Sequence, residues 1–119
     1  KKALSYYNQD KYVIILFSDE PVLALEKLQD LNCDIINAND IFADDEDQFF
    51  MISLCDVKIC CNSSFSLMAC YFNEIYNFVE DSEYIFPDHW FGKNGPEYDM
   101  NDLISINNKL GNAISSDIN

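Results

Sequence analysis

Residues 12–21 read Tyr12-Val13-Ile14-Ile15-Leu16-Phe17-Ser18-Asp19-Glu20-Pro21. The first six are apolar and rich in β-branched side chains, which is typical of a strand buried on both faces of a parallel sheet. The last four carry helix-start signals, namely capping side chains, acids and an early proline. Helical spacing continues in the apolar residues that follow: Val22, Leu25, Leu28 and Leu31. The stretch therefore predicts a strand followed by a helix over about residues 20–31.

The same alternation continues along the chain. Further strands are expected at residues 33–37, 57–61 and 76–79. A polar loop at 39–48 leads into a second helix, which runs through Phe49, Phe50 and Ile52. Two more helices are expected at residues 65–72 and 102–110. The order β-α-β-α-β-α-β predicts an α/β fold, in which a parallel sheet has right-handed crossovers and helices on both faces. Ligands of such sheets collect at the carboxyl ends of the strands.

Composition limits the class of protein. The 119 residues are enough for one domain, and 49% hydrophobic residues exclude a disordered chain. A net charge of −14 argues against nucleic acid or an anionic membrane as a partner. All seven cations are lysines, so a phosphate site here must use backbone N–H groups and hydroxyls, or cations from elsewhere. Residues 1–7 lack the apolar segment of a signal peptide and resemble the middle of a helix, so we expect a piece of a longer chain.

The cysteines do not form a metal or disulfide pattern. There are five, Cys33, Cys55, Cys60, Cys61 and Cys70, without a C-x-x-C, and His89 is the only histidine. We expect reduced, mostly buried thiols in a cytoplasmic protein, and no metal. The acids at residues 44–47 lack the spacing of a calcium loop.

Two strand-to-helix turns could carry chemistry, at residues 17–21 and 62–66. The second, Asn62-Ser63-Ser64-Phe65-Ser66, places three hydroxyls and an amide at a helix start after a buried strand. Unpaired N–H groups and the helix dipole favour an oxyanion there. Simple capping of the helix by Asn62 or Ser63 is the alternative, and Ser18-Asp19 in the first turn has the same two interpretations.

Several segments together resemble the bacterial-type α-1,2-fucosyltransferases, glycosyltransferase family 11. The segment Phe17-Ser18-Asp19-Glu20-Pro21 resembles their Phe-Ser-Asp-Asp-Pro. Residues 51–55 (MISLC) and 59–66 (ICCNSSFS) resemble Leu-Met-Ser-x-Cys and Asn-Ser-Thr-Phe-Ser. Asn73 falls where the family has a Leu-Asn, residues 87–92 (PDHWFG) resemble Pro-x-x-Trp-Phe-Gly, and residues 99–104 (DMNDLI) resemble the family's ending Asp-x-x-Asp-Leu-Ile.

The resemblance implies the C-terminal, Rossmann-like lobe of a GT-B enzyme. Such an enzyme transfers fucose from GDP-fucose to the 2-hydroxyl of a galactose-like acceptor, without a metal and with inversion. By this analogy the donor is held by Ser63, Ser64 and Phe65, with Asn62 and Ser66 beside them. Ser18 and Asp19 would line the same crevice. Asp47, or Gln48 in another register, would read the guanine edge; the catalytic base is not assigned.

The same resemblance implies parts that residues 1–119 lack. An N-terminal acceptor lobe and a His-x-Arg-Arg-x-Asp segment would precede Lys1, and only the parent enzyme's periphery would meet a membrane. Without that arginine we expect weak donor binding and no turnover. Leu67-Met68 also replaces the family's Trp-Trp, and Ser105-Ile106 its Pro and Trp. A non-catalytic α/β interaction module, or a transferase for another nucleotide sugar, therefore remains the alternative.

Overall fold

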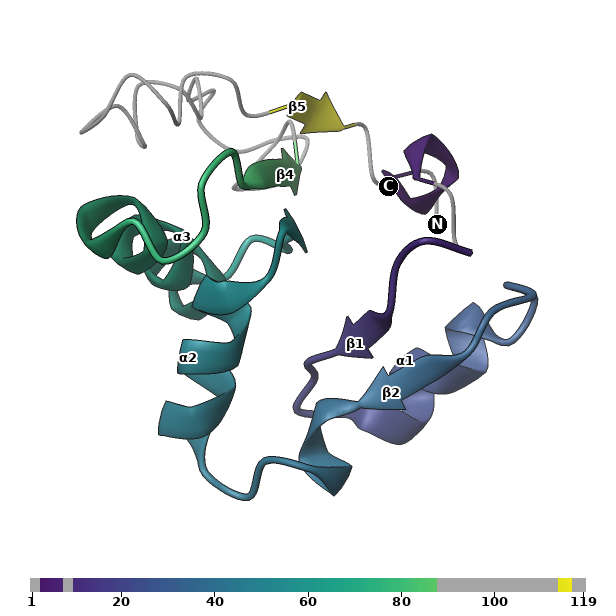
Figure 1. Ribbon diagram of the computed structural model, residues 1–119. Helices are drawn as coiled ribbons and strands as arrows, with labels where there is room; N and C mark the ends of the chain where they lie inside the picture. Colours follow the sequence, from purple (N-terminus) through teal and green to yellow (C-terminus); the bar gives the residue numbers. More distant parts are fainter. Residues whose placement is uncertain (1–2, 8–9, 88–113, 117–119) are drawn as a thin grey trace, which may run out of the picture. The chain divides into compact units, whose positions relative to one another are not determined.

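The structure, a computed structural model, describes residues 3–7, 10–87 and 114–116. These residues form helices and parallel strands, so the chain is α/β (Figure 1). The chain divides into two compact units, Lys1–Gln48 and Phe49–Asn119. Each unit contains a pair of parallel strands connected by a helix, as the alternating sequence predicts.

The first unit is built on a two-stranded parallel sheet. Its elements are the 3₁₀ helix η1 (Ala3–Tyr6), β1 (Ile14–Leu16), α1 (Pro21–Leu28), β2 (Ile35–Asn37) and the 3₁₀ helix η2 (Ala38–Asp40). β1 and β2 pair from Ile14 opposite Ile35 to Leu16 opposite Asn37. Pro21 opens α1 because a helix leaves its first N–H groups unbonded and proline has none to lose. The sheet thus ends with Asn37 beside the segment that follows Leu16.

The second unit contains a three-stranded parallel sheet in the order β3-β4-β5. Its elements are the end of α2 (Asp45–Leu54), then β3 (Val57–Ile59), α3 (Ser64–Tyr76), β4 (Glu83–Pro87) and β5 (Ile114–Ser116). Lys58 lies opposite Tyr84, and Ile85 opposite Ile114. α3 is the crossover between β3 and β4, so its first residues follow the carboxyl end of β3.

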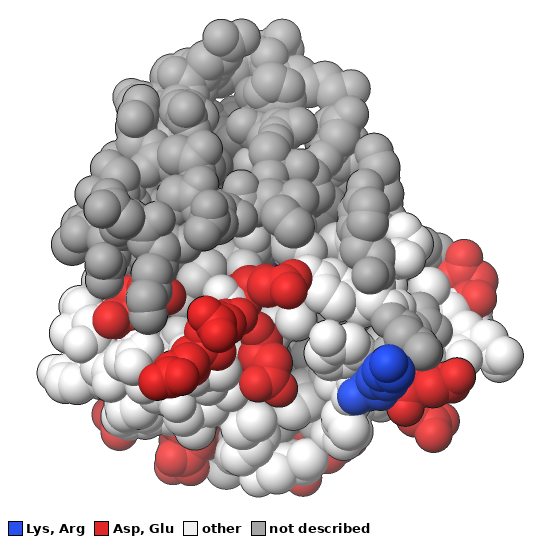
Figure 2. All heavy atoms as spheres, turned by 45° about the horizontal axis from the view of Figure 1, so that its top comes forward, with Lys and Arg blue, Asp and Glu red and all other residues white. Residues whose placement is uncertain are grey.

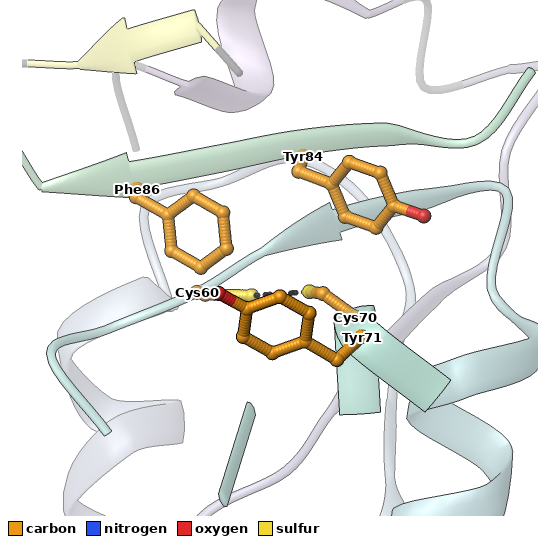
Figure 3. Close-up of a cluster of buried hydrophobic side chains, with 5 residues drawn as sticks. All are labelled: Cys60, Cys70, Tyr71, Tyr84 and Phe86. Carbon is orange, nitrogen blue, oxygen red and sulfur yellow. Dashed lines mark hydrogen bonds between the residues drawn. The ribbon is translucent and has the colours of Figure 1, made fainter. Parts of the chain in front are cut away.

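The core of the second unit lies between α3 and its sheet. Cys60 follows β3, Tyr84 and Phe86 come from β4, and Cys70 and Tyr71 come from α3 (Figure 3). Residues 58 and 60 share a face because successive strand side chains alternate, and both are buried. Ile59, on the opposite face, is 40% exposed, so β3 is buried on one face only. Burial on both faces, which is predicted for residues 12–17, is wrong: Tyr12 and Val13 are exposed, and β1 is only half-buried.

Aromatic side chains cover another part of the second unit. Phe72 of α3 has its ring within 5.7 Å of the rings of Phe49, Phe50, Tyr76 and Phe78. Phe50, Tyr76 and Phe78 remain exposed, at 47%, 59% and 44%. The helices α2 and α3 therefore present aromatic surface to their surroundings.

Strands are confirmed within the expected ranges 12–17, 33–37 and 57–61, and each is shorter than predicted: β1 lies in the middle of its range, β2 at the end and β3 at the start. The strand at 76–79 is wrong. α3 continues to Tyr76, Asn77 ends it in the left-handed conformation, and the strand follows at Glu83–Pro87. The polar loop at 39–48 is also wrong in part, because η2 and the first turn of α2 occupy most of it. The predicted helix at 102–110 lies outside the described residues.

The larger-scale predictions are met only in part. Among the described residues no pairing joins the two sheets, so one continuous sheet over residues 1–119 stays a prediction. All five cysteines are reduced, but "mostly buried" is wrong: only Cys60 and Cys70 are buried, and Cys61 is exposed. Acidic side chains predominate over basic ones on the face drawn in Figure 2. Within the described part of the chain no helix is long and apolar enough to cross a membrane.

Candidate functional site

The turn between β3 and α3 holds five of the predicted donor-binding residues. Ser63 is the N-cap of α3, with the extended backbone that this position requires. Its N–H donates to the Cys61 carbonyl over 2.8 Å, and its carbonyl accepts from Leu67 N–H over 3.1 Å. Its hydroxyl makes no capping hydrogen bond. Ser63 therefore occupies the N-cap position, but its side chain does not cap the helix.

The side chains of this turn are accessible. Asn62, Ser64 and Phe65 are exposed, and Ser63 and Ser66 are half-buried. The 13 residues of α3 give the turn a helix dipole whose positive end lies at Ser64. N–H groups in the first turn of a helix have no acceptor within the helix. The turn can therefore offer amides and hydroxyls to an anion.

Two residues of the turn have additional contacts. Ser66 donates its hydroxyl to the Ser63 carbonyl over 3.1 Å, which fixes the turn and commits the hydroxyl proton. The ring of Phe65 is 40% exposed and meets Phe49 edge-on, with 5.5 Å between ring centres. Ser66 thus stabilises the conformation of the turn, whereas part of the Phe65 ring is exposed next to the turn.

The first turn, after β1, is held by local hydrogen bonds. Ser18 accepts a hydrogen bond from Glu20 N–H at its hydroxyl, over 3.0 Å, just before α1 begins. The Ser18 carbonyl accepts from the side-chain amide of Asn39, also over 3.0 Å. Asp19 is exposed. The Ser18 hydroxyl thus has the local role expected of a serine before a helix, and the acidic side chains of this turn, Asp19 and Glu20, are exposed.

The structure places Asp47 and Gln48 differently. Asp47 is exposed in the first turn of α2, where an acid stabilises the positive end of the helix. Gln48 is half-buried, and its amide donates to the Asn39 side-chain oxygen over 2.9 Å and to the Phe42 carbonyl over 3.2 Å. Asn39 in turn contacts Ser18. Gln48 is therefore linked to Ser18 through hydrogen bonds to Asn39. Asp47 is placed on the exposed side of the helix start.

The predicted site residues fall into two groups. Ser18, Asp19 and Asp47 belong to the first compact unit, and residues 62–66 belong to the second. Within the first unit, hydrogen bonds link Ser18 through Asn39 to Gln48. In both units the group follows the carboxyl end of a parallel strand, which is where α/β folds bind ligands.

A buried lysine, Lys58, is the feature that the sequence pattern did not single out. Lys58 is 3% exposed, and its ammonium donates to the Cys55 carbonyl over 2.6 Å and to the Ser82 hydroxyl over 2.7 Å. The same ammonium lies 5.1 Å from the centre of the Tyr84 ring. Burial lowers the pKa of Lys58, with neighbouring thiols and Asp56 opposing that shift. Alternation along 57–60 was the available signal, because it puts Lys58 on the same face as Cys60.

Lys58 does not serve the turn at residues 62–66. Its two hydrogen bonds go to residues before β3 and before β4, that is, to the amino ends of the strands. The turn lies after the carboxyl end of β3. The charge of this lysine is therefore directed away from the candidate anion site.

No group of three or more metal-ligating side chains occurs within residues 3–7, 10–87 and 114–116. The acids at residues 44–47 are exposed at the start of α2. His89, and the residues that resemble Pro-x-x-Trp-Phe-Gly and Asp-x-x-Asp-Leu-Ile after Pro87, lie outside the described residues.

Comparison with protein-family models, with curated proteins and with solved structures gives no match to this chain. A functional assignment therefore depends on the chain's own residues and on the geometry of the two turns.

Proposed function

We propose that this chain is the donor-binding part of a glycosyltransferase similar to the α-1,2-fucosyltransferases, with GDP-fucose as donor and a galactose-like acceptor. One observation carries the proposal: an accessible turn lined with hydroxyls, Asn62 to Ser66, opens a long helix directly after a parallel strand. The α/β element order supports a Rossmann-like lobe of a GT-B enzyme. The ordered sequence motifs support the donor.

In this proposal the start of α3 binds the diphosphate. Amides of the first turn and the hydroxyls of Ser63 and Ser64 donate to phosphate oxygens, and the helix dipole adds to the attraction. Ser66 keeps the turn in shape through the Ser63 carbonyl. Phe65 offers its exposed ring edge or face to the sugar.

By the resemblance, a residue at the start of α2, Asp47 or Gln48, recognises the guanine base. Gln48, fixed by Asn39 and Phe42, is better positioned than the exposed Asp47 to meet a base. An amide oxygen accepts from one N–H of guanine, whereas a carboxylate accepts from two, so base selection through Gln48 is weaker.

Transfer needs positive charge that these residues do not supply. The acceptor 2-hydroxyl attacks the anomeric carbon while GDP departs with the bonding electron pair, and charge builds on the diphosphate. Lys58 is committed to Cys55 and Ser82, and the chain has no arginine. The resemblance supplies that charge from a segment outside residues 1–119, together with the acceptor lobe.

A substitution at Ser64 tests the phosphate contact. We expect Ser64→Ala to weaken GDP-fucose binding by about 1 kcal/mol, roughly fivefold, because one hydrogen bond to the diphosphate is lost. Ser64→Thr keeps the hydroxyl and is the matched control. Titration calorimetry gives both affinities; equal affinity of Ser64→Ala and the unchanged protein would mean that this serine does not contact the donor.

A second candidate is a non-catalytic α/β interaction module. The observation in its favour is the exposed aromatic surface on α2 and α3, since aromatic side chains are enriched in protein interfaces. The missing arginine also agrees with it. Binding of GDP-fucose ahead of GDP-mannose and UDP-galactose would favour the transferase, and absence of any nucleotide-sugar binding would favour the module.

A further inference from the structure

Two buried thiols of the second unit are in contact. Cys60 lies directly after β3 and Cys70 lies in the middle of α3, and their sulfur atoms are 3.8 Å apart. Figure 3 shows the pair between the rings of Tyr71, Tyr84 and Phe86. Cys60 is 6% exposed, whereas Cys70 is fully buried. Of the two cysteines, only Cys60 therefore retains some exposure.

The surroundings distinguish the two sulfur atoms chemically. The hydrogen bond with Cys70 lowers the pKa of Cys60, with the Lys58 charge assisting and burial opposing. The pKa of Cys70 is raised, first by the hydrogen bond to Cys60 and then by burial. The directions of these pKa shifts favour loss of the proton at Cys60, which is also the member with residual exposure. Only a thiolate attacks a disulfide.

We infer that Cys60 and Cys70 form a redox-active dithiol, with Cys60 as the attacking sulfur and Cys70 as the resolving one. The oxidant is a small, exposed disulfide of the glutathione type. This inference is independent of the proposed transferase function, because it requires only the pair and its surroundings.

The reaction balances as ordinary thiol–disulfide exchange. The Cys60 thiolate attacks one sulfur of the oxidant, which forms a mixed disulfide and releases the first thiolate. Cys70 then loses its proton and attacks the Cys60 sulfur, which forms the Cys60–Cys70 bond and releases the second thiolate. The two protons of the cysteines end on the two released thiols. The sulfur atoms must approach from contact to about 2 Å, a small movement within the core.

The other thiols are less suited to this exchange. Cys55 is half-buried and donates its thiol proton to the Met51 carbonyl over 3.2 Å, and burial raises its pKa. Cys61 is exposed and Cys33 half-buried, so a reagent can reach both. The sulfur atoms of Cys60 and Cys70, by contrast, are already in contact with each other. Adducts are expected at Cys33 and Cys61, and an internal disulfide only at the pair.

The experiment exposes the folded chain to glutathione buffers of increasing oxidation. Peptides are then mapped by mass spectrometry without reduction, after the remaining thiols have been blocked. We expect a peptide that joins Cys60 to Cys70 with the loss of two hydrogens, and its disappearance after dithiothreitol. A variant that combines Cys33→Ser, Cys55→Ser and Cys61→Ser should form the same bond at the same buffer ratio.

Cys70→Ser tests the order of attack. Without a resolving sulfur, Cys60 should accumulate as its glutathione adduct. The same reaction in urea exposes every thiol, so the preference for the Cys60–Cys70 bond should disappear there. If the folded protein carries adducts at Cys33 and Cys61 while Cys60 and Cys70 remain unmodified, or if the internal bond joins other cysteines, the inference is wrong. That mapping uses the unchanged chain and does not depend on how the variants fold.

Discussion

At the scale of single residues, a polar network inside the second unit joins α3 to β4. Asn73 is 1% exposed, and its amide donates to the Tyr84 hydroxyl over 2.7 Å while its oxygen accepts from Val79 N–H over 2.9 Å. Tyr84 in turn donates to the Glu74 carboxylate over 2.6 Å. Buried polar groups stabilise a fold only when they are paired, and here each one is. The network explains why a polar residue occupies an interior position of α3.

Tyr84→Phe tests this network. The change removes the hydroxyl from between Asn73 and Glu74, so we expect the free energy of unfolding at neutral pH to fall by about 1–2 kcal/mol. Burial, and then the hydrogen bond to Glu74, raise the pKa of Tyr84 above its ordinary value of 10.0. Urea denaturation followed by fluorescence or circular dichroism gives the free energy.

The same variant has a predicted pH dependence. The folded protein holds the Tyr84 proton more tightly than the unfolded chain does, so this contribution to stability is complete below about pH 10 and is lost as pH rises above it. The unchanged protein should therefore lose stability above pH 10 more steeply than Tyr84→Phe. Lys58 and Tyr71 titrate in both proteins, so the difference between the two curves isolates Tyr84. Parallel curves would show that the tyrosine proton does not stabilise the fold.

At the scale of elements, the end of α3 decides where the next strand begins. Asn77 has φ of 51° and lies just after the helix, and its N–H donates to the Asn73 carbonyl over 2.6 Å. Asparagine tolerates this left-handed conformation better than most residues, and glycine tolerates it best. The chain then leaves the helix and reaches β4 six residues later.

Substitutions at Asn77 test this helix end. Asn77→Val forces a β-branched residue into the left-handed region, so we expect a loss of about 1–2 kcal/mol in the free energy of unfolding. Asn77→Gly should be neutral or slightly stabilising, which makes it the matched control. Thermal or urea unfolding measures both. A valine variant as stable as the glycine variant would mean that α3 ends without strain at this position.

The elements also show how far the sequence predicts the fold. Residues 14–16 belong to an uninterrupted apolar run, and β-branched Val57 and Ile59 flank Lys58; both segments are strands, as their β-branched side chains predict. Residues 76–79 have a similar composition, but Asn77 suits a helix end, and the pattern does not distinguish these uses. β4 was missed because Glu83 opens it and Pro87 closes it, so its buried centre is only three residues long.

Parts of the candidate site that depend on local sequence could be predicted, whereas parts that depend on contacts between distant residues could not. Local order fixes the turn at residues 62–66, since a strand followed by serines and a helix requires that geometry whatever surrounds it. The choice between Asp47 and Gln48 depends on Asn39 and Phe42, which contact Gln48 only in the folded unit. Lys58 was not recognised because its partners, Cys55 and Ser82, lie 3 and 24 positions away.

At the scale of the whole molecule, charge opposes the proposed ligand. A net charge of −14 repels a dianionic nucleotide over a Debye length of about 8 Å at physiological salt. The attraction at the start of α3 acts only within its first turn. Residues 1–119 should therefore bind a sugar nucleotide weakly. Because the proposed contacts are made by backbone N–H groups of the first turn of α3, the chemical shifts of these amides should respond to binding directly.

The central claim is that the first turn of α3 binds the diphosphate of a guanosine sugar nucleotide. Amide chemical shifts of ¹⁵N-labelled residues 1–119, recorded during titration with GDP-fucose, GDP-mannose and UDP-galactose, test it most directly because they detect weak binding residue by residue. We expect the largest changes at Ser63, Ser64 and Phe65, and at the lowest concentration for GDP-fucose. Unchanged shifts at these three residues, or a stronger response to UDP-galactose, would contradict the account.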